Sequence, residues 1–108
     1  MATASYFQKG ESLDYVNNTD EVIATGTIVD LSTRIGVAGM DINPEETGSL
    51  HVTGVFEIAK DTATELTVGQ AVYFDGEQIT SDTSGTPAGY AVAYAAASDE
   101  TAFVKLLG

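Results

Sequence analysis

Cysteine and tryptophan are absent from this chain of 108 residues, and positive charge is scarce. Without cysteine the chain has no disulfides and no thiol chemistry, and its redox compartment cannot be inferred. Four Lys and Arg residues stand against sixteen Asp and Glu residues, which gives a formal net charge of −12. Because nucleic-acid affinity depends on phosphate neutralisation by basic side chains, we expect no DNA or RNA partner. The same charge disfavours binding to an anionic membrane surface.

Long apolar runs are also missing. No stretch of about 18 apolar residues occurs, so no membrane-spanning segment is predicted.

A single helix is predicted, over residues 59–66 (AKDTATEL), with Asp61 or Thr62 as its cap. The remaining sequence alternates short apolar runs with turns rich in Gly, Asn and Asp, a pattern typical of β-strands. A chain of this length forms one domain with a lean core.

Period-two alternation is clearest in residues 34–60, RIGVAGMDINPEETGSLHVTGVFEIAK. One side of the second run carries Leu50, Val52, Gly54, Phe56 and Ile58, and the other carries Ser49, His51, Thr53 and Glu57. This is the pattern of a strand with one buried face. In the intervening NPEETG, Pro44 fixes φ and Gly48 permits a positive φ. Residues 35–42 and 49–58 are therefore predicted to form a β-hairpin.

The other predicted strands are residues 22–24, 27–31, 71–75, 89–97 and 102–107, and residues 75–87 are a polar loop or an irregular hairpin. In the 89–97 strand we expect Tyr90, Val92 and Tyr94 to fill a core, while the alanine side admits a close neighbour. The predicted fold is all-β, a small barrel or sandwich of short antiparallel strands. Residues 1–20 are expected to form an N-terminal arm and residues 21–108 the barrel or sandwich domain.

A weak internal repeat runs through the chain. Residues 25–31 align with 68–74 at an offset of 43, and residues 35–38 align with 88–91 at an offset of 53. Short strands with Gly-rich turns also match one another by chance, so both readings stay open. A true repeat predicts a pseudo-symmetric barrel or sandwich built from two similar three-stranded units.

Three aromatic residues near the N-terminus, Tyr6, Phe7 and Tyr15, are candidate contacts with a partner. Aromatics in a terminal segment can anchor an extended chain across another protein. The alternative is that the segment folds back as an edge strand on its own domain, since a terminus needs some tie to be ordered. The sequence does not decide between these two.

No residue pattern predicts catalysis, a cofactor or a metal. His51 is the single histidine, and it lies on the polar face of its strand without a neighbouring Ser or Asp motif, so we expect it to be exposed. Carboxylates occur in pairs at Asp20-Glu21, Glu45-Glu46, Asp75 with Glu77, and Asp99-Glu100. They lack the spacing of a calcium loop, so we interpret them as solvated turns. We therefore predict no catalytic, cofactor-binding or metal residues and no enzymatic activity.

Several short motifs, in order, resemble a family of small tailed-phage proteins described as capsid decoration (cement) or capsid fibre proteins. The matching pieces are Gly36-Val37-Ala38, Gly54-Val55-Phe56 with Lys60 following, Gly69 with Val72-Tyr73, Gly89-Tyr90-Ala91, and Val104 to Gly108. They span about Tyr6 to Gly108. The family often has Asp and Trp where this chain has Gln70 and Phe74. Neither difference interrupts a strand.

The resemblance implies a β-domain on the outer surface of the virion, bound to the phage major capsid protein as a homotrimer and needing no cofactor. Some family members carry a recombinase label, which these residues do not support because no G-x-x-x-x-G-K-[ST] loop occurs. Two other functions remain open. One is the base of a head fibre, and the other is an acidic DNA mimic that inhibits a host defence protein. The concentration of acids in turns disfavours the mimic.

Overall fold

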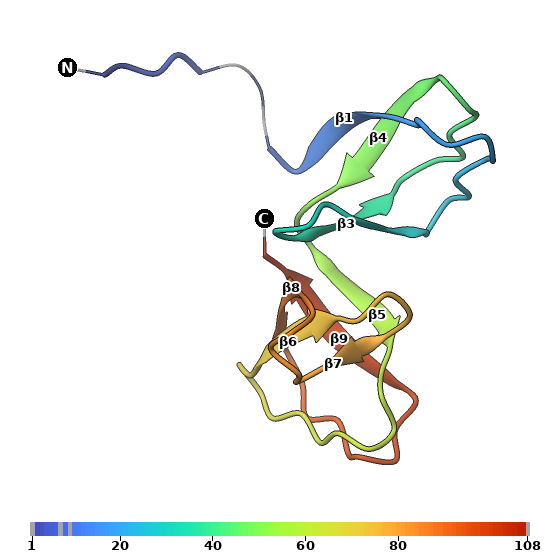
Figure 1. The fold of residues 1–108 in the computed structure, drawn as a ribbon. Helices are drawn as coiled ribbons and strands as arrows, with labels where there is room; N and C mark the ends of the chain where they lie inside the picture. The colour runs from blue at the N-terminus through green and yellow to red at the C-terminus, as the bar shows by residue number, and fades with distance from the viewer. Residues whose placement is uncertain (1, 7, 9, 108) are drawn as a thin grey trace.

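The protein is built from short β-strands in two antiparallel sheets (Figure 1). The computed structural model describes residues 2–6, 8 and 10–107, and this part of the chain contains nine strands and no helix. The strands are β1 (Ser12–Val16), β2 (Ile28–Asp30), β3 (Ile35–Ala38), β4 (Thr47–His51), β5 (Val55–Ala59), β6 (Ala71–Phe74), β7 (Ile79–Thr80), β8 (Thr86–Ala91) and β9 (Thr101–Leu106). The prediction of an all-β fold is confirmed.

The two sheets form two lobes joined by the link between β4 and β5 (Figure 1). The first sheet has the order β1-β4-β3-β2, and the second has the order β5-β9-β8-β6-β7. The second sheet closes on itself, because Lys60 after β5 forms a parallel bridge with Ile79 of β7. The amide of Asp61 donates to the carbonyl of Ile79 at 2.9 Å. The C-terminal lobe is thus a small barrel.

The predicted internal repeat is present in the structure. Strands β1, β4, β3 and β2 have the same spatial order as β5, β9, β8 and β6. The hydrogen bonds beside the strands also correspond, since Gly26 N donates to Ala38 O at 2.8 Å and Gly69 N donates to Ala91 O at 2.7 Å. These pairs are related by the predicted offsets of 43 and 53 residues. The two repeats share four corresponding strands, one more than the three expected, and the second repeat adds β7.

The main core lies inside the barrel. Its members are buried apolar side chains from every barrel strand and from the loops: Ile58, Leu66, Val72, Phe74, Ile79, Ala88, Ala91, Ala95, Ala102, Val104 and Leu106. Small side chains suit this interior because a narrow closed sheet leaves little room between opposite walls. Ile35 and Val37 of β3 join the same cluster. The first sheet is therefore packed onto the barrel through β3.

The predicted hairpin of residues 35–42 and 49–58 is confirmed in part. Strands β3 and β4 pair antiparallel across the NPEETG turn. The positive φ in that turn is at Glu45 (67°), not at Gly48 as predicted. Gly48 is required for space, because a Cβ atom there would overlap the side chain of Ile42.

The single strand predicted over residues 49–58 is wrong. The chain bends at Gly54, which has a φ of 111°, and β4 and β5 belong to different sheets. The predicted sides are nevertheless kept, since Leu50, Val52 and Ile58 are buried while His51 and Glu57 are exposed. Buried and exposed side chains thus continue to alternate through the bend, so the alternation alone does not indicate where the chain bends.

The predicted helix over residues 59–66 is also wrong. Residues 61–64 make one turn, in which the Asp61 carboxylate accepts a hydrogen bond from the Ala63 amide at 2.9 Å. Leu66 then exchanges two backbone hydrogen bonds of 2.9 Å with Ala95. A segment this short has little helix stability of its own. The sheet-like pairing of Leu66 decides its conformation.

The expected orientation of the 89–97 strand is reversed. Tyr90 is 41% exposed and Tyr94 is 59% exposed, whereas Ala91 and Ala95 are buried in the barrel core. The strand β8 ends at Ala91. The register explains the reversal, because Tyr90 lies opposite Ala71 and Lys105, which both point outward.

The segment of residues 75–87 was predicted to be a polar loop or an irregular hairpin. It contains β7, which pairs with β6, so it is an irregular hairpin.

Aspartate side chains hold several turns, and the clearest case is Asp75. Its Oδ1 accepts hydrogen bonds from the amides of Glu77 and Gln78, each at 2.9 Å. These two backbone hydrogen bonds hold the pKa of the Asp75 carboxyl below its ordinary value of 3.8. A lowered pKa in the folded state stabilises the fold above the unfolded-state pKa, and this contribution disappears as pH falls through the folded-state pKa.

We therefore predict a pH-dependent effect of Asp75→Asn, which keeps an acceptor oxygen but removes the charge. The free energy of unfolding, measured by urea titration, is expected to be lower in the variant at pH 7. The difference between the two proteins should shrink as pH falls below about 4, because both side chains are then neutral. Comparing the two proteins at each pH cancels the general repulsion of a chain with net charge −12. A difference that stays constant down to pH 2 would contradict the prediction.

Candidate functional site

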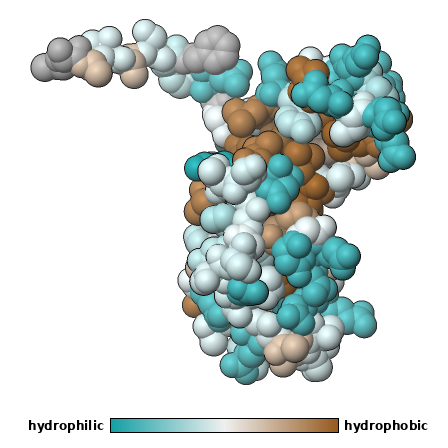
Figure 2. Space-filling view, in the orientation of Figure 1, coloured by the Kyte–Doolittle hydropathy of each residue, from teal (hydrophilic) through white to brown (hydrophobic). Residues whose placement is uncertain are grey.

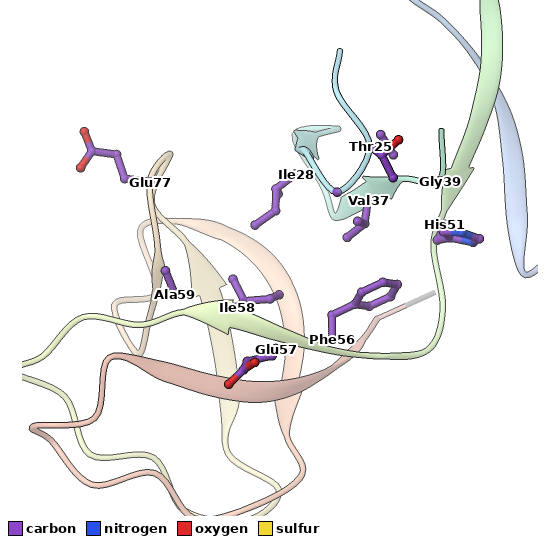
Figure 3. A pocket seen from close by; sticks show the side chains of 12 residues that line it. Thr25, Ile28, Val37, Gly39, His51, Phe56, Glu57, Ile58, Ala59 and Glu77 are labelled. Carbon is purple, nitrogen blue, oxygen red and sulfur yellow. The ribbon is translucent and has the colours of Figure 1, made fainter. Parts of the chain in front are cut away.

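An apolar cleft of about 510 Å³ lies between the first sheet and the barrel. Its walls come from both repeats: Ile28 of β2 and Val37 of β3 on one side, Phe56 and Ile58 of β5 on the other. Figure 3 shows these side chains pointing toward one another across the cleft. In Figure 2 apolar side chains gather at the same waist between the lobes. The cleft exists because the chain bends at Gly54 and carries β5 away from β4.

The ends of the cleft are polar. His51 lies at one end, with its ring centroid 6.2 Å from that of Phe56. The carboxylate of Asp41 accepts hydrogen bonds from Thr25, which also borders the cleft, and Glu77 lies at the other end. No Lys or Arg is among the described residues that line the cleft. The surface is thus apolar within and acidic at its edges.

A second apolar surface lies on the outside of the barrel, and we call it the outer barrel face. It consists of Val55, Tyr90, Phe103 and Lys105. The three apolar side chains are between 41% and 54% exposed. Lys105 Nζ lies 5.8 Å from the centre of the Tyr90 ring. Exposed aromatic and aliphatic side chains gathered on one face are typical of contact surfaces.

Of the three predicted contact residues, the structure places Tyr6 in the N-terminal segment and Tyr15 in β1. Tyr6 is 84% exposed in the N-terminal segment, which extends away from the body of the protein (Figure 1). Tyr15 is half-buried in β1, where it lies opposite Gly48 of β4. Phe7 lies outside the described residues. The described residues 2–6 therefore extend away from the domain (Figure 1), and residues 12–16 form an edge strand of the first sheet.

The paired carboxylates are all exposed, and the structure does not bring the pairs together. Among the described residues, no three Asp, Glu or His side chains are grouped so that they could hold a metal ion. His51 is exposed, as predicted, and its ring contact is with Phe56. The described part of the chain also contains no helix long and apolar enough to cross a membrane.

Two buried polar side chains occupy equivalent places in the two repeats, 43 residues apart. Asn17 follows β1 and donates from Nδ2 to the carbonyls of Glu21 and Ile42, each at 2.8 Å. Lys60 follows β5 and donates from Nζ to the carbonyls of Asp61 at 2.6 Å and Ala97 at 2.9 Å. Each side chain ties the end of a strand to a loop of its own repeat. Their role is to satisfy buried backbone acceptors.

Sequence reasoning did not predict the cleft or the outer barrel face. Both depend on the bend at Gly54, which turns β5 out of the first sheet. The available clue was a glycine inside an otherwise regular alternating run, which is a known sign of a bend or bulge in a strand. Phe56 and Ile58 were assigned to a buried side, and in the structure they face the barrel core and the cleft.

Comparison with known protein families yields a match. The profile of a family described as "Phage cement protein" matches residues 7–106, which is nearly the whole chain. No curated protein and no solved structure matches the chain.

Proposed function

Because the chain belongs to the phage cement protein family, we propose that it stabilises the phage head by stoichiometric, non-covalent binding to the shell. The family assigns a structural role in capsid decoration, on the outer surface of the virion. The proposed partner is the phage major capsid protein. No cofactor and no catalytic step are part of the proposal.

The observation that supports shell binding is the outer barrel face. In a chain with net charge −12, this face places three exposed apolar side chains around Lys105. Lys105 is the one Lys or Arg classed as exposed among the described residues. Such a face buries apolar area against a partner, and Glu57 lies opposite Phe103 beside it. The acidic turns elsewhere discourage unwanted self-association.

The mechanism is thermodynamic linkage. A protein that binds the assembled shell and not its separated subunits shifts the equilibrium toward the assembled state. At a free concentration of about 100 times the dissociation constant, one site adds about 2.7 kcal/mol. Many sites on one shell act together, so modest contacts at each site stabilise the head substantially.

We further propose that the aromatic residues of the N-terminal region make contacts in the assembled state. Tyr6 and Phe7 are proposed to contact the shell or a second copy of the chain, and Tyr15 to support the same region from β1. A homotrimer is the proposed oligomer. A cyclic arrangement of identical chains presents the same face of every chain to the shell.

The proposal predicts a specific loss on Phe103→Ser. Phage heads stripped of the protein should become more heat-resistant when purified protein is added, as measured by the temperature at which DNA is released. The variant is expected to bind these heads at least about tenfold more weakly, because an aromatic contact at an interface centre is commonly worth more than 1.4 kcal/mol. Urea unfolding establishes that the variant is folded.

Val68→Ser is the matched control, since Val68 is also apolar and is 69% exposed, but lies in a turn before β6. Its affinity for the heads should remain within about twofold of the original. Failure of the unmodified protein to bind the heads at all would refute the proposed function. Equal affinity of the two variants would refute the assignment of the outer barrel face.

A further inference from the structure

We infer that the N-terminal segment of a second copy of this chain occupies the cleft between the two sheets. This inference rests on the proposed homotrimer and deepens it, because it names the surface of the second copy that receives the N-terminal segment. It rests on three features: the unfilled cleft, the composition of the N-terminal segment, and the distribution of charge between them.

The cleft leaves apolar side chains without a covering partner. Ile28 and Phe56 pack against the edge of the main core but remain only partly buried. Figure 3 shows their side chains and that of Val37 directed into the open space. A volume of about 510 Å³ is enough for a few side chains of an extended segment. An apolar concave surface of this kind is a typical binding site.

The N-terminal segment has the chemistry to fill such a cleft. Its first ten residues, MATASYFQKG, place an aromatic pair between short side chains. The described residues of this segment, 2–6, 8 and 10, are all exposed, so these residues do not fill the cleft of their own chain. Extended over nine residues it reaches about 30 Å, which exceeds the 22 Å thickness of the molecule. It can therefore cross a neighbouring copy.

The charges of the segment and the cleft are complementary. The first ten residues contain Lys9 and no acid, whereas all sixteen acids follow from Glu11 onward. The acids among the described lining residues are Glu57 and Glu77, and Asp41 accepts hydrogen bonds from Thr25 at the border. No Lys or Arg is among these lining residues. The segment therefore brings two aromatic side chains together with a positive charge and no repulsive carboxylate. An acidic segment of a different partner would be repelled.

The path of the segment favours a second copy over the same chain. Glu11 is held at the edge of the first sheet, where its carbonyl accepts a hydrogen bond from Val52 N at 3.1 Å. From there the segment runs outward from the body (Figure 1). Insertion into its own cleft would require the chain to reverse and pass around β4. Insertion of each segment into the next copy is a heterologous contact, which closes into a ring such as the proposed trimer.

A cysteine pair tests the inference, and the chain has no native cysteine to interfere. The full chain carrying Ala4→Cys and Ala59→Cys places one thiol in the segment, with both aromatic side chains kept, and one at an exposed position of the cleft. The control carries Ala4→Cys and Ala71→Cys, because Ala71 is exposed on the outside of the barrel. Both purified proteins are oxidised and analysed on a denaturing gel without reductant.

We expect the cleft pair to form covalent multimers. Their yield should be at least about fivefold higher than the yield from the control pair. A cross-linked monomer would overturn the inference, because it would place the segment in its own cleft. Equal cross-linking of the two pairs would also overturn it, leaving the cleft to another partner such as a capsid segment. None of these outcomes depends on the shell-binding assay, so the two proposals fail separately.

A second measurement uses a variant that does not alter the barrel or the cleft. Tyr6→Ser with Phe7→Ser in the full chain should weaken self-association at least about tenfold in analytical ultracentrifugation. Its urea unfolding curve, measured at a concentration where the protein is monomeric, should be unchanged, because Tyr6 is 84% exposed. Self-association as strong as that of the original protein would overturn the inference.

Discussion

Replacing Gly89 with alanine is expected to destabilise the protein by about 4 kcal/mol, the largest effect we predict for a single substitution. Gly89 lies in β8 with a φ of 148°, a conformation that side chains rarely adopt. A Cβ atom there would also overlap the carbonyl oxygen of Lys105 in β9. Because that oxygen belongs to the backbone of the neighbouring strand, relief requires β8 and β9 to separate. A loss of this size is a large part of the 5–15 kcal/mol that typically stabilises a domain.

Gly76→Ala separates the two causes of this effect. Gly76 also has a positive φ, at 105°, but a Cβ atom there has no other atom within 4 Å. Its substitution should cost only about 1 kcal/mol, the usual penalty for a left-handed backbone. The measurement is the free energy of unfolding in urea. Similar losses in the two variants would show that the close approach of β8 to β9 is not as described.

Replacing Asn17 with alanine is expected to cost about 3 kcal/mol. The Asn17 side chain is fully buried and satisfies four backbone or hydroxyl groups. Its Oδ1 accepts from Thr19 N at 2.9 Å and Thr19 Oγ1 at 2.6 Å. Removal breaks all four hydrogen bonds, although the Ile42 carbonyl keeps Ile23 N and the Glu21 carbonyl keeps Thr19 Oγ1 as donors. At about 0.5–1.5 kcal/mol for each hydrogen bond lost, the sum is about 3 kcal/mol.

Asn18→Ala is the control, because Asn18 is the next residue and is exposed. It should change the free energy of unfolding by less than about 0.5 kcal/mol. Lys60 occupies the equivalent place in the second repeat, so Lys60→Met should also destabilise the protein. The loss there should be smaller, because methionine avoids the desolvation cost of a buried ammonium. An Asn17→Ala variant as stable as the control would contradict the structural role of this side chain.

The strands and the repeat could be predicted because local patterns determine them. Alternating apolar residues and Gly-rich turns predict β3, β4, β6 and β9 to within a few residues. The alignment of Gly26 with Gly69 predicts the repeat, and in the structure these two glycines have similar φ values of 87° and 85°. In each case the residues that carry the pattern are neighbours in the chain.

The errors occur where distant residues decide the structure. Closure of the barrel through Ile79 puts Ala91 and Ala95 inside and leaves Tyr90 and Tyr94 outside. Nothing near residue 90 indicates this, because the closing strand β7 lies in a polar segment. The pairing of Leu66 with Ala95 likewise overrides the predicted helix. The cleft was missed for the same reason, since its walls come from strands of different sheets.

The most direct test of the account is the copy number of this protein in purified particles of the phage that encodes it. Quantitative mass spectrometry against the major capsid protein measures the ratio. A capsid cement protein is predicted to occur at one copy per capsid subunit or at another fixed simple fraction, as expected for binding at every equivalent lattice site. A handful of copies per particle would indicate a fibre or vertex component, and absence from the particles would contradict the proposed function.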